Sequence, residues 1–273
     1  MLAGKEDVHV SGNTRKIREV WEYNLEEEIM RVSHLIEKYP CVGMDTEFPG
    51  FVAKPVGEFS EKSVFVFQCL RVSVDLTKVI QIGLTICDDK GNLPESCPLN
   101  RDGISTWQFN FKFDSYTDCC SADALVILKR AKVDFDKHKR VGISMKDFGE
   151  LLTSSGLVLN PAVRWISFHS GYDFGYLLKI LTFNPLPETG EKFYAMLKKF
   201  FPCFYDLKYM MNHTKKLHGG LQDLCEFFGI ERVGEQHQAG SDSLMTAKVF
   251  FSFRAAFVDV GGEEAYQGKL FGL

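Results

Sequence analysis

One nine-residue stretch constrains the fold of this chain more than any other feature. In STWQFNFKF, residues 105–113, an aromatic side chain stands at every second position: Trp107, Phe109, Phe111 and Phe113. The residues between them are Gln108, Asn110 and Lys112. Successive side chains of a strand point to opposite faces of a sheet, so this alternation predicts a strand with one apolar face.

Two further segments belong to the same sheet. The stretch VIQIGLTIC, residues 79–87, is β-branched and mostly apolar, which is typical of a buried strand. CVGMDT, residues 41–46, is a shorter segment of the same kind. The link between the segments 79–87 and 105–113 is short, so the three segments predict an antiparallel meander.

Helical spacing appears on both sides of these strands. Apolar residues recur at three- and four-residue steps over 17–39, as one helix or two in tandem, and helices are also predicted over 121–132 and 144–156. We predict that the charged stretch 134–140 is a solvated loop. Beyond residue 160, short strands and helices alternate. A meander followed by β-α-β-α predicts an α/β layout.

Composition narrows the class of protein. The chain has 273 residues, of which 45% are hydrophobic and 25% charged, as in a globular protein. We expect residues 1–16 to be a flexible N-terminal lead-in and residues 17–273 to form one domain. No apolar run reaches 18 residues, so no membrane span is expected.

Cysteine usage and charge bear on compartment and partners. The eight cysteines include no C-x-x-C pair, and the first residues lack the apolar core of a secretion signal. We therefore expect reduced thiols and a cytoplasmic location, with the nucleus as a second compartment. The net charge of −4 argues against broad non-specific binding of nucleic acid. Any such contact would depend on a local patch or on bound metal ions.

Four acids and one histidine carry the functional prediction. Asp45 and Glu47 lie one residue apart at the end of the first predicted strand. Asp173 lies where a strand passes into a helix, and Asp242 lies in the first turn of the last long helix. His237 precedes Asp242 by five residues. Each residue alone has a simpler interpretation, as a solvated strand end, a favourable charge at a helix N-terminus or a surface histidine.

Together, these residues suit hydrolysis of a phosphodiester. Carboxylates that converge cannot all stay ionised unless positive charge offsets them, and Mg²⁺ or Mn²⁺ prefers oxygen ligands. Two such ions, roughly 3.5–4 Å apart, stabilise the attacking and leaving oxygens of an in-line displacement. A histidine near the attacking water would be its general base. We predict that Asp45, Glu47, Asp173 and Asp242 bind two divalent cations and that His237 is the base.

The motifs around these residues resemble a known family. MDTEFPG, FHSGYDFGYLLK and HQAGSDS stand in the order of the three exonuclease motifs of the DEDD superfamily. The surrounding sequence, including IREVW, STWQFNFKF, ELLTSSG, YDLKYMM, GGLQDL and LFGL, resembles the Caf/Pop-type deadenylases, the catalytic subunits of the carbon-catabolite-repression–Not complex. The resemblance extends over nearly the whole chain from Ile17. It is weaker at 114–142, where none of the five predicted site residues lies.

The resemblance implies a fold, an activity and partners. It implies an RNase H-like fold, with a mixed five-stranded sheet flanked by helices. It implies 3′→5′ removal of poly(A) from messenger RNA with release of AMP, and the spacing from His237 to Asp242 fits the histidine branch of the superfamily. The implied partners are poly(A) RNA, a large Not scaffold subunit, a deadenylase subunit with leucine-rich repeats and, in animal relatives, Tob-type proteins.

Other functions remain open at this point. The chain would also suit a DEDD-type exonuclease acting on another nucleic-acid 3′ end, or a catalytically silent subunit of the deadenylase complex. A glycoside hydrolase would use two carboxylates and leave the other two unexplained. Phe48, beside Glu47, suits either base stacking or core packing, with packing favoured. Lys208, Lys215 and Lys216, with His213 and His218, form a modest basic region that suits either an RNA backbone or a solvated loop.

Overall fold

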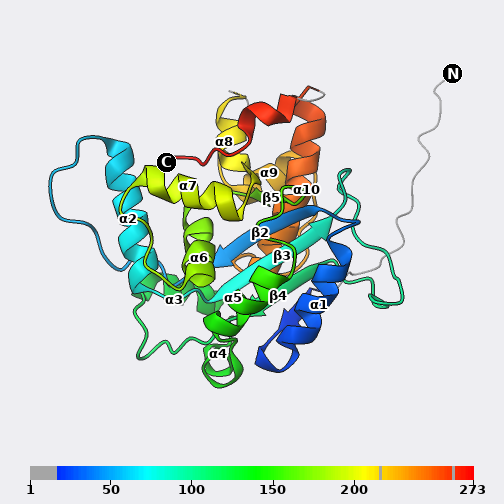
Figure 1. Ribbon diagram of the computed structural model, residues 1–273, viewed down its shortest axis with the longest axis horizontal. Helices are drawn as coiled ribbons and strands as arrows, with labels where there is room; N and C mark the ends of the chain where they lie inside the picture. The colour runs from blue at the N-terminus through cyan, green and yellow to red at the C-terminus, as the bar shows by residue number, and fades with distance from the viewer. Residues whose placement is uncertain (1–16, 215–216, 260–261) are drawn as a thin grey trace.

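The computed structural model describes residues 17–214, 217–259 and 262–273 (Figure 1). The predicted lead-in at 1–16 lies outside the described residues, as do Lys215 and Lys216 of the predicted basic region. A six-stranded sheet runs through the molecule in the order β1-β4-β3-β2-β5-β6. Its strands are β1 Arg18–Val20, β2 Cys41–Glu47, β3 Gln81–Cys87, β4 Thr106–Asn110, β5 Arg164–Ser167 and β6 Cys203–Asp206.

Helices cover both faces of this sheet (Figure 1). The α-helices are α1 Leu25–Leu35, α2 Lys62–Leu76, α3 Ala122–Arg130, α4 Phe135–Val141, α5 Met145–Ser154, α6 Gly171–Thr182, α7 Gly190–Phe200, α8 Leu207–Asn212, α9 Leu221–Phe227 and α10 Ala239–Phe257. Helices α1, α5 and α6 lie on one face, and α2 and α7 pack beside α6. On the other face α10 crosses β2, β3 and β4, with α9 packed against it.

The predicted fold class is confirmed, with one additional strand. β2, β3 and β4 form the expected antiparallel meander, and β5 and β6 extend it in parallel from β2. The sixth strand is β1, which pairs in parallel with β4. The prediction of helix from residue 17 is wrong there, because Val20 gains complete burial by pairing with Phe109. Helix α1 begins only at Leu25.

A second prediction fails for a related reason. Residues 134–140, predicted to be a solvated loop, are mostly helical and form most of α4. The Asp134 side chain caps this helix, and its apolar side is held by buried Phe135 and His138. The ring Nδ1 of His138 lies 2.7 Å from the carbonyl oxygen of Phe111. A charged sequence therefore conceals two side chains that fix the helix to the sheet.

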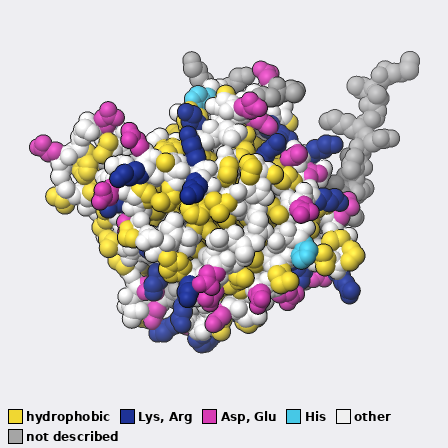
Figure 2. Space-filling model, viewed as in Figure 1, with side chains coloured by type: hydrophobic (Ala, Val, Ile, Leu, Met, Phe, Trp, Pro, Cys, Tyr) yellow, Lys and Arg dark blue, Asp and Glu magenta, His cyan; other side chains and the backbone are white. Residues whose placement is uncertain are grey.

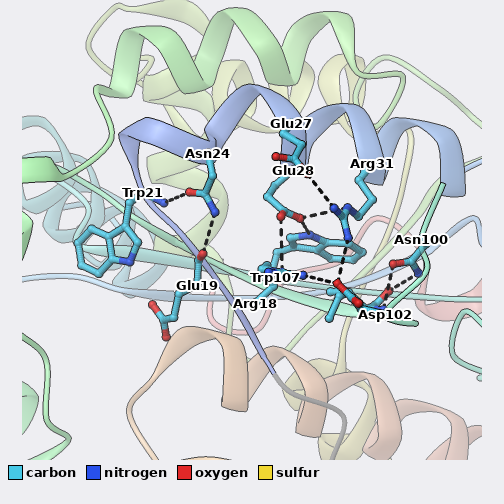
Figure 3. A network of polar contacts seen from close by, with 11 residues as sticks. Arg18, Glu19, Trp21, Asn24, Glu27, Glu28, Arg31, Asn100, Asp102 and Trp107 are labelled. Atoms are coloured by element: carbon cyan, nitrogen blue, oxygen red, sulfur yellow. Dashed lines mark hydrogen bonds and ion pairs between the residues drawn. The ribbon is translucent and has the colours of Figure 1, made fainter. Parts of the chain in front are cut away.

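An ion-pair network attaches α1 and β1 to β4 (Figure 3). The buried carboxylate of Glu28 accepts the indole N–H of Trp107 at 2.8 Å. Arg18 and Arg31 both approach Glu28 at 3.5 Å, and Arg18 also donates to Asp102 at 2.8 Å. Two cations and an indole donor therefore compensate the burial of one carboxylate.

Two glycines allow α10 to lie directly on the sheet. A Cβ on Gly43 of β2 would stand 2.7 Å from the carbonyl oxygen of Ser243. A Cβ on Gly83 of β3 would stand 1.8 Å from the carbonyl oxygen of Ala239, the first residue of α10. Any side chain at these positions would displace the helix, so the glycines determine how closely the N-terminus of α10 approaches β2.

The surface agrees with the mild net charge. On the face drawn in Figure 2, acidic and basic side chains are interspersed instead of forming one extended positive field. Within the part of the chain that the structure describes, no helix has the length and apolar character needed to cross a bilayer.

Candidate active site

The site is built first from the end of β2. Side chains alternate along the strand, so Asp45 and Glu47 share the face of Gly43, which is the face covered by α10. Glu47 is opposite Gln81 of β3, and its carbonyl oxygen accepts the Ile80 N–H at 2.8 Å. Both acids line an open pocket of about 500 Å³.

The N-terminus of α10 brings the next residues to this pocket. Asp242 lies in the first turn of α10, and its Oδ2 accepts the backbone N–H of His237 at 2.9 Å. His237 has a φ of 62°, in the left-handed region that side chains other than glycine rarely adopt. Asp242 and His237 both line the pocket. Ligand atoms of Glu47, His237 and Asp242 lie within 4.8 Å of one another.

Asp173 approaches from the opposite face of the sheet. It lies in the first turn of α6 and is almost fully buried. The Thr46 hydroxyl, between Asp45 and Glu47 in the chain, donates to Asp173 Oδ1 at 2.6 Å. Asp173 is not among the residues that line the pocket, although it is close enough for its charge to act on Asp45 and Glu47.

Burial and mutual repulsion raise the pKa values of three of these acids. Burial, followed by the charges of Asp242, Asp173 and Glu47, raises the pKa of Asp45 well above its usual range. Burial and the charges of Asp242 and Asp173 raise the pKa of Glu47 in the same way. Burial raises the pKa of Asp173 to about 7 despite the hydrogen bond from Thr46. The protein alone therefore provides too little positive charge for these carboxylates.

Arg232 contributes one positive charge from the loop before α10. Its Nη1 donates to Asp242 Oδ1 at 2.6 Å and to Ser241 Oγ at 3.0 Å. Its Nε donates to Gln222 Oε1 at 2.9 Å, and the side chain lines the same pocket. Arg232 was not among the site residues predicted from the sequence. An arginine five residues before His237, in an acidic chain, was the available signal.

A cluster of side-chain amides holds the loop that carries His237. The Oε1 of Gln238 accepts from Gln81 Nε2 at 2.9 Å and from Gln108 Nε2 at 2.7 Å. The Gln238 Nε2 donates to the carbonyl oxygen of Ala131 at 2.7 Å. The oxygens of Gln81 and Gln108 in turn accept the first backbone N–H groups of α10, at Ala239 and Gly240. The polar face of the predicted strand 105–113 therefore orients the N-terminus of α10.

Another carboxylate fixes the start of α6. Asp206, at the end of β6, has no exposed surface and accepts four backbone N–H groups, from His169, Ser170, Lys208 and Phe271. Burial raises its pKa. Asp206 therefore connects the turn that precedes Asp173 with the segment around Phe271. It was not predicted as a site residue, and as the N-cap of α8 it looks like an ordinary capping residue.

Phe48 packs as the favoured interpretation predicted. Its ring stacks on Tyr172 with centroids 5.3 Å apart and an interplanar angle of 11°, and it packs against the core that lies between the sheet and α6. Tyr172 immediately precedes Asp173. The pair therefore joins the chain segments that carry Glu47 and Asp173.

The donor set fits hard divalent cations. Carboxylate oxygens and one imidazole nitrogen converge, and burial together with neighbouring acidic charges raises the pKa values of Asp45 and Glu47. Divalent cations bound there would polarise a phosphodiester and lower the pKa of water. The chain contributes the oxygen ligands, a nearby imidazole and an arginine.

Comparison with known proteins shows the family of this chain. The family described as CAF1 family ribonuclease matches residues 20–148 and 157–250, which is most of the chain. The chain belongs to the CAF1 ribonuclease family. It is therefore a ribonuclease, and the resemblance recognised from its motifs is confirmed.

Relatives of this CAF1-family chain cover nearly its whole length. Poly(A) ribonuclease pop2 of Schizosaccharomyces pombe is 46% identical over 265 residues, covering 97% of this chain and 77% of the relative. A solved structure of S. pombe Pop2p in a form with Mg²⁺ and Mn²⁺ bound superposes with a TM-score of 0.89 at 46% identity, covering 94% of this chain and 99% of that one.

A third similarity concerns assembly. The structure of the yeast NOT1 MIF4G domain co-crystallised with CAF1 contains a chain that matches with a TM-score of 0.78 at 30% identity. The match covers 96% of this chain and 98% of that one.

Proposed function

We propose that this chain shortens poly(A) tails from the 3′ end, releasing AMP, with two divalent cations bound by Asp45, Glu47, Asp173 and Asp242. The observation that carries the proposal is the convergence of Asp45, Glu47 and Asp242 with His237 in one pocket of a CAF1-family chain. Relatives described as poly(A) ribonuclease and as bound to Mg²⁺ and Mn²⁺ support the substrate and the ions.

In the proposed mechanism, three elements of the fold position the ligand residues. Asp45 and Glu47 present oxygens from a rigid strand, and Asp242 does so from a helix that glycines seat on the sheet. Thr46 orients Asp173, which would complete the ligand set. The cations, when bound, supply the Lewis acid for attack on the terminal phosphodiester.

His237 is proposed to take the proton of the attacking water. It is exposed at the pocket, and its backbone is held in place through Asp242 and through the amide cluster at Gln238. One of its ring nitrogens also lies within 4.8 Å of carboxylate oxygens of Glu47 and Asp242, where it could bind an ion. A role as base therefore requires that the ring turn toward the attacking water and away from the ions.

The proposal includes partners and a location. A Not scaffold is proposed as a binding partner because a similar CAF1 chain was co-crystallised with a NOT1 MIF4G domain. A leucine-rich-repeat deadenylase subunit and Tob-type proteins are proposed from the motif resemblance alone. The proposed location, the cytoplasm with the nucleus as a second compartment, rests on the cysteine usage and on the proposed substrate.

A nuclease assay tests the activity directly. Oligoribonucleotides ending in A, U or C tails are incubated with Mg²⁺, Mn²⁺ or EDTA, and products are resolved by length. We expect stepwise loss of AMP from A tails, slower loss from the others and none in EDTA. Equal rates on all tails would favour a DEDD exonuclease of another specificity and would contradict the poly(A) assignment.

Substitution tests the ligand assignment. Asp45→Asn keeps the size of the side chain and removes its charge, so we expect hydrolysis to be abolished while the circular dichroism spectrum is unchanged. Asp136→Asn makes the same change at an exposed side chain of α4, away from the pocket, and is the matched control. Activity near that of the wild type in Asp45→Asn would refute the assignment. A wild-type protein inactive under all conditions would indicate the silent-subunit alternative.

A further inference from the structure

Arg232 has unused hydrogen-bonding capacity in the pocket. A guanidinium carries five N–H groups, and three of them are engaged: Nε with Gln222 and Nη1 with Ser241 and Asp242. Among residues 17–214, 217–259 and 262–273, no hydrogen-bond acceptor is found for the two N–H groups of Nη2. The side chain is only 15% exposed, so the contacts of Nε and Nη1 hold the guanidinium in one orientation.

The charge balance of the pocket indicates what the two N–H groups of Arg232 Nη2 could bind. Asp45, Glu47, Asp173 and Asp242 together carry four negative charges when ionised, which two divalent cations of the proposed function would neutralise. Among these four acids, the two ions and Arg232, the guanidinium then remains as one surplus positive charge. Asp223 also lines the pocket, but it is exposed and its carboxylate accepts the Gly220 N–H at the start of α9.

We propose that Arg232 binds a non-bridging oxygen of the substrate phosphodiester backbone in this pocket. The inference rests on the proposed function, because it takes single-stranded RNA as the ligand. Arginine presents N–H groups in a geometry that matches phosphate oxygens, and such charge-assisted bonds are short and strong. A chain with a net charge of −4 needs a local cation of this kind to attract an anionic strand.

The contact with Asp242 places the Arg232 guanidinium beside the proposed ion site. Its Nη1 lies 2.6 Å from Asp242 Oδ1, so the guanidinium adjoins the proposed ion site without occupying the side of Asp242 that accepts the His237 N–H. Gln222 and Ser241 hold the guanidinium in place when RNA is absent. The ordering cost of the side chain is therefore met before the substrate arrives.

Binding without turnover tests the role. Labelled octa-adenylate is titrated with the full chain in Ca²⁺ at several salt concentrations, and Mn²⁺ binding to the RNA-free protein is followed by electron paramagnetic resonance. We expect Arg232→Gln to weaken octa-adenylate binding at least tenfold. The slope of log K against log salt should become shallower by about 0.7, as for one lost phosphate contact on a single strand. Mn²⁺ affinity should stay within about twofold.

Further variants separate this role from a structural one. Arg232→Lys should keep the salt slope while losing affinity, because it keeps the charge without the fork. Gln222→Leu, which removes the acceptor of Nε, should weaken binding by a smaller factor than Arg232→Gln. Arg101→Gln makes the same charge change in the exposed loop before β4, at the opposite end of the sheet, and should bind RNA as the wild type does.

Two outcomes would overturn the inference. One is wild-type RNA affinity and salt slope in Arg232→Gln. The other is a loss of Mn²⁺ binding that matches the loss of RNA binding, which would make Arg232 a residue that orients Asp242. In both, the wild type still degrades A-tailed RNA, whereas failure of the proposed function would appear as a wild type without that activity.

Discussion

Replacement of Gly83 by alanine should inactivate the enzyme through the position of one helix. A Cβ at this position would lie 1.8 Å from the carbonyl oxygen and 2.2 Å from the carbonyl carbon of Ala239. These are backbone atoms, so no rotamer change relieves the contact. Ala239 begins α10, and Asp242 follows three residues later in its first turn.

The size of the effect follows from that contact. Moving the Ala239 oxygen from 1.8 to 3.0 Å, the lower limit for real Cβ contacts, requires a shift of about 1.2 Å. A misplacement of about 1 Å among the residues of an active site lowers the rate roughly 10²-fold. Overpacking of a tight interface costs about 1–3 kcal/mol of folding free energy. We therefore expect kcat to fall about 100-fold in a protein that still folds.

The assay compares Gly83→Ala with Gly190→Ala. The latter adds the same methyl group at the start of α7, where the nearest atom is 3.9 Å away, so its kcat and melting temperature should match those of the wild type. Rates on A-tailed RNA are measured at a temperature where calorimetry shows both variants folded. Wild-type kcat in folded Gly83→Ala would refute the claim that this glycine positions Asp242.

Three other predictions test the surroundings of the site. Gln238→Ala removes the acceptor shared by Gln81 and Gln108, so kcat should fall about tenfold with little change in KM, as steady-state kinetics would show; an unchanged kcat would mean that the amide cluster does not position His237. In EDTA, the stability that depends on Asp173 should be complete below about pH 4 and be lost as pH rises through about 7, because its folded pKa is raised to about 7 from an ordinary value near 3.9. Urea denaturation from pH 5 to 8 would show this loss, and Asp173→Asn should make the profile shallower, with the remaining slope coming from Asp45 and Glu47, whose pKa values are also raised; parallel profiles would contradict the assignment. Glu28→Ala leaves the buried indole N–H of Trp107 without its acceptor, while Arg18 and Arg31 keep Asp102 and Glu27, so we expect a loss of about 1–3 kcal/mol in unfolding free energy, and a loss below about 0.5 kcal/mol would show that the network in Figure 3 contributes little.

Local pattern explains why much of the architecture was predictable. The period-two alternation at 105–113 and the apolar run at 79–87 are properties of neighbouring residues, and both become strands of the predicted meander. The helices predicted over 121–132 and 144–156 also appear, as α3 and α5, and the side chains of Ser121 and Ser144 cap their N-termini. The segment 18–20 was mistaken for helix because only its pairing with β4 makes it a strand.

The sequence by itself determined the family of this chain: the motifs that contain Asp45, Glu47, Asp173, His237 and Asp242 sufficed to recognise it. Only the tertiary structure decided how these residues meet. Gly83 admits α10 to the sheet, the amides of Gln81 and Gln108 orient its first turn, and Arg232 adjoins Asp242. Periodicity and motifs record interactions between residues a few positions apart. These contacts join segments that lie from 10 to 158 positions apart, and the longest of them form only when the sheet and α10 pack together.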